Sequence, residues 1–276
     1  MNRLSLQKRA QILHFLVEGN SMRAASRMAD MSINTVTKLL VDEGYACARF
    51  QDKALVNLPC KRIQCDEIWA FCYAKAKNAP TDMKGKGLAG DIWTWTALDP
   101  DSKLMVSWLV GDRDVRAATR FMNDVASRLA NRVQLTTDGH KGYLVATDSA
   151  FNEKIDYAML VKLYGETGNQ TPERKYSPGE CCGAEKTFVC GNPDPAHIST
   201  SMVERQNLTM RMGMRRFTRL TNGFSKKVQN HAYAVALHFM HYNFGRVHKT
   251  LRVTPAMQAG VADHVWTLEE IANLAN

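Results

Sequence analysis

The chain has 276 residues, of which 45% are hydrophobic and 23% are charged, as in ordinary globular proteins of one or two domains. Lys and Arg number 36 against 27 Asp and Glu, and the resulting net charge of +9 favours a polyanionic partner. No apolar run approaches the roughly 20 residues that span a bilayer, and the seven scattered cysteines fit reduced thiols better than a disulfide framework. We therefore expect no membrane partner and a cytoplasmic location.

Residues 4–44 have the apolar spacing of helices, with Ser5, Ser21 and Ser32 placed as N-caps. Residues 21–40 form a helix-turn-helix pattern. Its second helix would present four polar side chains to a DNA groove, namely Asn34, Thr35, Thr37 and Lys38. The alternative is a small three-helix bundle that does not bind DNA. The pattern predicts an all-α helix-turn-helix DNA-binding domain over residues 1–45 and a linker over 46–60.

Beyond the linker the sequence predicts strands and helices in alternation. The order is three strands, a helix, a strand, a helical segment and a further strand. The strands are expected over residues 61–74, 92–98, 104–110, 133–137 and 154–164, and the first helix over 114–130. This is the order of a ribonuclease H-like core, an α/β fold in which a mixed five-stranded sheet has flanking helices.

The core is expected to occupy residues 61–250. Residues 165–197 are polar and rich in Pro and Gly, which predicts a long loop or insertion. A helical tail over 251–276 follows, where Thr267 and Glu270 have capping-box spacing.

Three carboxylates fall on rigid elements of this predicted core. Asp66 lies in the first strand, Asp138 directly follows the fourth, and Glu204 is near the start of a helix. The first and fourth strands of such a sheet are neighbours, so Asp66 and Asp138 should converge. Between residues 195 and 260, Glu204 is the single acid among ten Lys or Arg residues. Three carboxylates commonly hold a pair of hard cations that activate phosphodiester chemistry.

The motifs around these acids carry a family resemblance. The segments "QCDEIWAF", "LTTDGHKGY" and "SMVERQNLTMRMGMRR" resemble the three blocks of DDE transposases, and most of all the insertion-sequence-one family in its single-frame, helix-turn-helix branch. The resemblance extends over nearly the whole chain, including "GDIWTWTALDPDSKLMVSWLVGDRD" and "HYNFGRVHKTLRVTPAMQAG". The latter is similar to the tails of enzymes with a retroviral-integrase-like catalytic core.

The resemblance implies a DNA transposase that binds insertion-sequence ends and catalyses strand nicking and strand transfer into target DNA. The DDE triad and the ligands of two Mg²⁺ or Mn²⁺ ions would be Asp66, Asp138 and Glu204. The partners would be double-stranded DNA, as terminal inverted repeats and target, and a second copy of the chain in at least a dimer. A nucleoid-associated location in the cytoplasm follows from that role.

Two features depart from the family pattern. The chain lacks the N-terminal cysteine zinc ribbon of some members, and the interval from Asp138 to Glu204 is longer than in compact relatives. One alternative is a non-catalytic helix-turn-helix regulator derived from a transposase. Another is a cellular ribonuclease H-like nuclease, which the N-terminal recognition pattern disfavours.

Further candidates for DNA contact follow from charge and spacing. Arg211 lies seven residues after Glu204, on the same helical face, where integrase-like enzymes often carry a basic residue. The remaining candidates are Arg205, Arg215, Arg216, His140, Lys141, Asn243, Arg246, His248 and Lys249. A solvated basic face is the alternative, although exposed helices usually mix both signs of charge.

Two assignments stay open at the level of sequence. Glu67 is adjacent to Asp66, and strand alternation places the two on opposite faces, so we expect only Asp66 in the site. Cys181, Cys182, Cys190 and His197 are candidate zinc ligands, but adjacent cysteines do not match the usual spacing.

Overall fold

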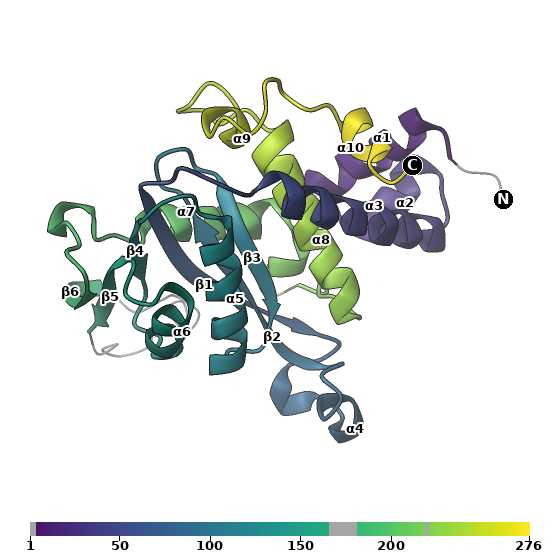
Figure 1. Cartoon of the computed structure of the whole chain (residues 1–276). Helices are drawn as coiled ribbons and strands as arrows, with labels where there is room; N and C mark the ends of the chain where they lie inside the picture. Colours follow the sequence, from purple (N-terminus) through teal and green to yellow (C-terminus); the bar gives the residue numbers. More distant parts are fainter. Residues whose placement is uncertain (1–3, 166–180, 219–220) are drawn as a thin grey trace.

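The computed structural model describes residues 4–165, 181–218 and 221–276. In that part of the chain a six-stranded mixed sheet has the strand order β3-β2-β1-β4-β5-β6 (Figure 1). The strands are β1 (Arg62–Cys72), β2 (Gly90–Leu98), β3 (Met105–Gly111), β4 (Gln134–Thr137), β5 (Asp156–Tyr164) and β6 (Cys181–Cys190).

The strand pairing is consistent with the predicted ribonuclease H-like core. β1 pairs antiparallel with β2 and parallel with β4, β2 pairs antiparallel with β3, and β4 pairs parallel with β5. The prediction of five strands was wrong, because β6 adds a sixth strand antiparallel to β5. Most β6 side chains are exposed, so the segment lacks the apolar alternation of a half-buried strand. Within the predicted insertion over 165–197, residues 166–180 lie outside the described residues.

Helices cover both faces of the sheet. The helices α5 (Val115–Arg128) and α6 (Gly142–Phe151) lie on one face, and α7 (Ser201–Gly213) lies on the other (Figure 1). The apolar stripe of α5, which includes Phe121, Met122 and Val125, is fully buried. α7 buries Val203 and Met210 towards the sheet and leaves Arg205 exposed.

The N-terminal residues form three helices, α1 (Leu6–Val17), α2 (Met22–Ala29) and α3 (Ile33–Ala54). The predicted caps are confirmed, since the hydroxyls of Ser5, Ser21 and Ser32 accept backbone N–H bonds from the first turns. The predicted linker over 46–60 is helical as far as Ala54, because α3 continues well beyond its expected end.

The last helices of the chain pack against the N-terminal helices. α3 packs against α8 (Val228–Met240), and α1 packs against α10 (Leu268–Asn273). Gly44 permits the first contact, since a Cβ at this position would lie 2.5 Å from the Tyr233 Cβ. The predicted capping box of Thr267 and Glu270 starts α10. One continuous cluster of buried side chains joins these helices to the sheet.

The remaining helical segments are short. They are η1 (Ala76–Asn78), α4 (Thr81–Lys84), η3 (Pro195–His197), η4 (Arg215–Phe217), the π-helical turn η5 (His241–Gly245) and α9 (Pro255–Gln258). None of the helices described here is both long and apolar enough to cross a bilayer.

Candidate active site

The register of the parallel strands brings two predicted acids together. Cys65 of β1 pairs with Thr137 of β4, and β4 ends there. The next residues are Asp66 and Asp138, so both carboxylates lie at the same point of the sheet. This convergence is what the neighbouring positions of the first and fourth strands predicted.

The third predicted acid reaches the same place from α7. Gln64 Oε1 accepts the backbone N–H of Met202 at 3.0 Å, and Asn207 Nδ2 donates to Asp66 Oδ2 at 2.8 Å. These bonds fix the first two turns of α7 against β1. As a result Asp66, Asp138 and Glu204 all line one cavity of about 680 Å³.

Glu204 is held within this cavity by two donors. Thr200 Oγ1 donates to Glu204 Oε1 at 2.6 Å, and Lys162 Nζ, on β5, donates to Glu204 Oε2. The carboxylate therefore has a cationic partner of its own.

The tightest group of acids differs from the predicted triad. In the described part of the chain, oxygens of Asp66, Glu67 and Asp138 lie within 4.8 Å of one another. Glu67 is 8% exposed and does not line the cavity, and it accepts from Arg113 Nε at 3.2 Å. Of the two adjacent acids, only Asp66 lines the cavity, although Glu67 belongs to the cluster of carboxylate oxygens. Asp138 lies just beyond the last paired residue of β4, so its side chain approaches both acids. In the sequence, the two adjacent acids of "CDE" were the signal for this cluster.

The electrostatics of the cluster suit a cation. Burial, and after it the charge of Asp138, raise the pKa of Asp66 to about 7. Burial and the same neighbour raise the pKa of Glu67 to about 7. Glu67 Oε1 is buried, and a hydrogen bond from the Tyr143 hydroxyl partly opposes this rise in the pKa of Glu67. An all-oxygen set of mutually repelling carboxylates fits a hard divalent cation such as Mg²⁺ or Mn²⁺.

His140 and Lys141 follow Asp138 at the rim of the cavity. The His140 N–H donates to Asp138 Oδ1 at 3.0 Å, and its ring packs 5.6 Å from Trp95. Burial and the charge of Arg113 lower the pKa of His140, so it is neutral at pH 7. Lys141 is exposed.

The four candidates on α3 lie in its first two turns. Asn34 and Lys38 are exposed, while Thr35 and Thr37 are half-buried. Thr37 Oγ1 donates to the Ile33 carbonyl at 2.7 Å, and Lys38 forms an ion pair with Asp42 at 2.6 Å. Asn34 thus presents its side chain to solvent with the fewest competing contacts.

The basic candidates fall into separate groups. Arg205 and Arg246 are exposed. Burial lowers the pKa of His248, and the charges of Lys103, Arg246 and Arg205 lower it further. Lys249 is exposed, and Arg211 is half-buried on α7 without lining the acidic cavity.

Arg215 and Arg216 line a second cavity, beside the N-terminal helices. The prediction that Asn243 contacts DNA was wrong, because its side chain is fully buried. Its amide forms hydrogen bonds with both the N–H and the carbonyl of Met105.

The cysteines do not form a metal centre in the described structure. Cys181 and Cys182 are exposed on β6, and no cluster of potential ligands there includes them. Arg62 hydrogen-bonds the ring of His197 instead.

Comparison with known proteins adds little to this geometry. No protein-family model and no curated protein sequence matches the chain. Among solved structures, one similar chain is a piggyBac transposase in a synaptic complex with hairpin DNA, at 12% identity and a TM-score of 0.39. The match covers 98% of this chain and 69% of that one. A likeness this distant carries no argument about activity.

Proposed function

We propose that the protein is a DDE-type DNA transposase that binds insertion-sequence ends, nicks them and transfers the freed strand into target DNA. The observation that carries the proposal is the single cavity lined by Asp66, Asp138 and Glu204. The acids come from β1, the end of β4 and α7, the three elements on which the sequence motifs placed them. Membership of the insertion-sequence-one family belongs to the same proposal and rests on those motifs.

The three acids would hold two Mg²⁺ or Mn²⁺ ions. When bound, such ions activate an oxygen nucleophile and stabilise charge on the phosphorus and the leaving oxygen. Asn207 and the Glu67 N–H orient the Asp66 carboxylate, at 2.8 Å each. Arg113 lies 3.6 Å from Asp138 and limits the repulsion within the cluster.

DNA would be bound on both sides of this centre. The helix-turn-helix of α2 and α3 would read the element ends, chiefly through Asn34. Arg205 and Arg246 are exposed cations whose contact with backbone phosphates would weaken steeply with salt. Pairing two ends requires at least a dimer.

A second candidate is a non-catalytic DNA-binding regulator. The observation that favours it is the ion pair of Lys162 with Glu204, which neutralises that carboxylate without a metal ion. In a working enzyme Glu204 would have to exchange Lys162 for a metal ion.

The test is an assay on labelled element-end DNA with Mg²⁺ or Mn²⁺. We expect the wild type to nick the end, Asp138→Asn to lose nicking, and both to bind the DNA. Asp148→Asn is the matched control, since Asp148 is an exposed acid on α6 outside the cavity. Binding without nicking by the wild type supports the regulator, and equal nicking by Asp138→Asn overturns the site.

A further inference from the structure

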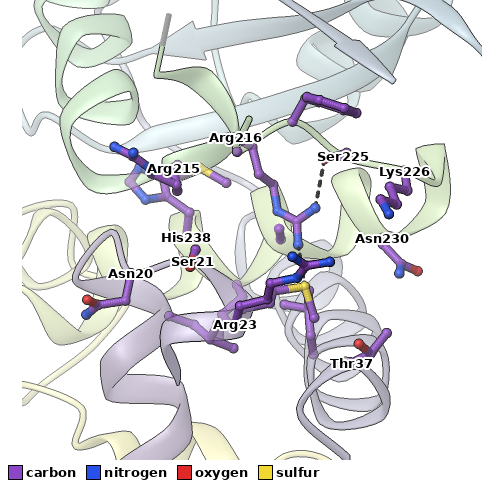
Figure 2. A pocket seen from close by; sticks show the side chains of 18 of the residues that line it. Asn20, Ser21, Arg23, Thr37, Arg215, Arg216, Ser225, Lys226, Asn230 and His238 are labelled. Atoms are coloured by element: carbon purple, nitrogen blue, oxygen red, sulfur yellow. Dashed lines mark hydrogen bonds between the residues drawn. The ribbon is translucent and has the colours of Figure 1, made fainter. Parts of the chain in front are cut away.

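A second cavity, of about 400 Å³, lies between the N-terminal helices and the catalytic core. One wall comes from α2 and α3 and the other from η4, residues 223–227 and α8 (Figure 2). The acidic cavity shares no residue with it. A ligand here would therefore contact both the predicted recognition helices and the core.

The charge of this cavity is strongly positive. Its lining includes five basic residues, namely Arg23, Arg215, Arg216, Lys226 and Lys227, and none of its lining residues is an Asp or a Glu. Figure 2 shows Arg23 from α2 and Arg216 from η4 pointing towards one another. Two guanidinium groups that face each other without a carboxylate between them repel. An anion bound between them would remove this electrostatic repulsion.

Arg216 is fixed in position for such a contact. Its Nη1 donates to Ser225 Oγ at 2.7 Å, and its Nη2 lies 3.2 Å from Met22 Sδ. The Ser225 hydroxyl also forms a hydrogen bond with His231 Nδ1, 2.9 Å away. Burial lowers the pKa of His231 to about 3, so its ring is neutral and can accept. A guanidinium has five N–H donors, so Arg216 keeps donors for a ligand.

The floor of the cavity is apolar, which distinguishes it from a simple phosphate site. Met22, Leu40, Met214 and Phe224 line it. The Phe224 ring is supported by Phe71, with ring centroids 4.9 Å apart. Aromatic rings within a basic groove are the combination that binds unpaired bases together with their phosphates.

We propose that this cavity binds one nucleotide of a DNA strand. The phosphate would lie between Arg23 and Arg216, and the base would pack on the apolar floor beside Phe224. The volume falls within the roughly 300–1,000 Å³ of ordinary small-ligand pockets. The choice of DNA as the source rests on the proposed function, because a free nucleotide has the same chemistry.

The test measures binding in EDTA, so that no cleavage is involved. A short fluorescent single-stranded oligonucleotide is titrated by anisotropy and then displaced with a deoxynucleoside monophosphate, the nucleoside alone or inorganic phosphate. We expect the monophosphate to displace it, and the nucleoside and phosphate to do so at least about tenfold more weakly. Displacement by inorganic phosphate at equal concentration overturns the nucleotide assignment.

Matched variants on α2 locate the site. Arg23→Ala should weaken binding of the monophosphate at least about tenfold. Arg27→Ala should change it less than about twofold, because Arg27 is exposed on the same helix but does not line the cavity. Equal effects of the two variants, or no binding by the wild type, overturn the proposal. Binding of the monophosphate without the oligonucleotide overturns a DNA strand as its source. None of these outcomes depends on nicking, so this proposal and the transposase proposal can fail separately.

Discussion

Asp66 and Asp138 lie side by side because the residues that precede them are paired in the parallel ladder of β1 and β4. The pairing places the buried Asp66 carboxylate beside Asp138, whose charge raises the free energy of the charged form of Asp66. A protein that keeps such a pair gains stability when a cation binds it.

Divalent metal should therefore stabilise the wild type. At pH 8 in EDTA, Asp66→Asn should raise the free energy of unfolding by roughly 1–3 kcal/mol, because the folded-state pKa of Asp66 is about 7 and its unfolded value is near 3.8. Because folding raises the pKa of this carboxyl, the free energy of unfolding of the protein falls as pH rises between those two values. Mg²⁺ should raise the melting temperature of the wild type and not that of the variant. Asp148→Asn should behave as the wild type, and an equal metal response in Asp66→Asn would remove Asp66 from the site.

Gly44 tests the packing of the N-terminal helices on the core. Gly44→Ala should destabilise the protein by about 1–3 kcal/mol in urea unfolding, since the new Cβ would meet Tyr233 Cβ at 2.5 Å. Gly85→Ala is the control, because its nearest contact would be the Thr81 carbonyl at 3.5 Å. Equal stability of the two variants would show that α3 and α8 do not pack this closely.

His238 should make stability depend on pH. Burial lowers its folded-state pKa from 6.5 to about 3, so below pH 6.5 the unfolded chain takes up a proton that the folded chain refuses. The free energy of unfolding should fall with decreasing pH, and His238→Phe should make this slope shallower by about 1 kcal/mol per pH unit between pH 6 and 5. His14→Phe, at an exposed position, should keep the wild-type slope. An unchanged slope in His238→Phe would mean that His238 is accessible to protons.

Asn34 tests the helix-turn-helix as a reader of sequence. Asn34→Ala should reduce the preference for element ends over random DNA by about tenfold, as expected for one lost base contact. Lys53→Ala, at the far end of α3, should leave that preference unchanged. Measured by competition at fixed salt, an unchanged preference in Asn34→Ala would remove α3 from recognition.

The sequence predicted those parts whose signals are local. Capping serines and the apolar stripe of α5 indicated helices, and the strand-like composition of residues 61–74 indicated β1. The order of these elements implied that Asp66 and Asp138 meet. β6 was missed because an exposed edge strand has no core-facing pattern.

The side-chain contacts between distant elements were also beyond reach. The bond of Lys162 to Glu204 and the approach of Arg23 to Arg216 depend on how whole elements pack. Neither contact can be predicted from the residue types alone.

The identity of the third acid tests the account most directly. Glu204 lines the cavity with Asp66 and Asp138, whereas Glu67 lies closer to both, does not line the cavity and is paired with Arg113. The measurement is the rate of strand transfer from a pre-cut element end in Mg²⁺, beside DNA binding. Glu204→Gln should lose transfer by at least about 100-fold with binding intact, and Glu67→Gln should retain most of it. Transfer that survives in Glu204→Gln and is lost in Glu67→Gln would contradict the proposed triad.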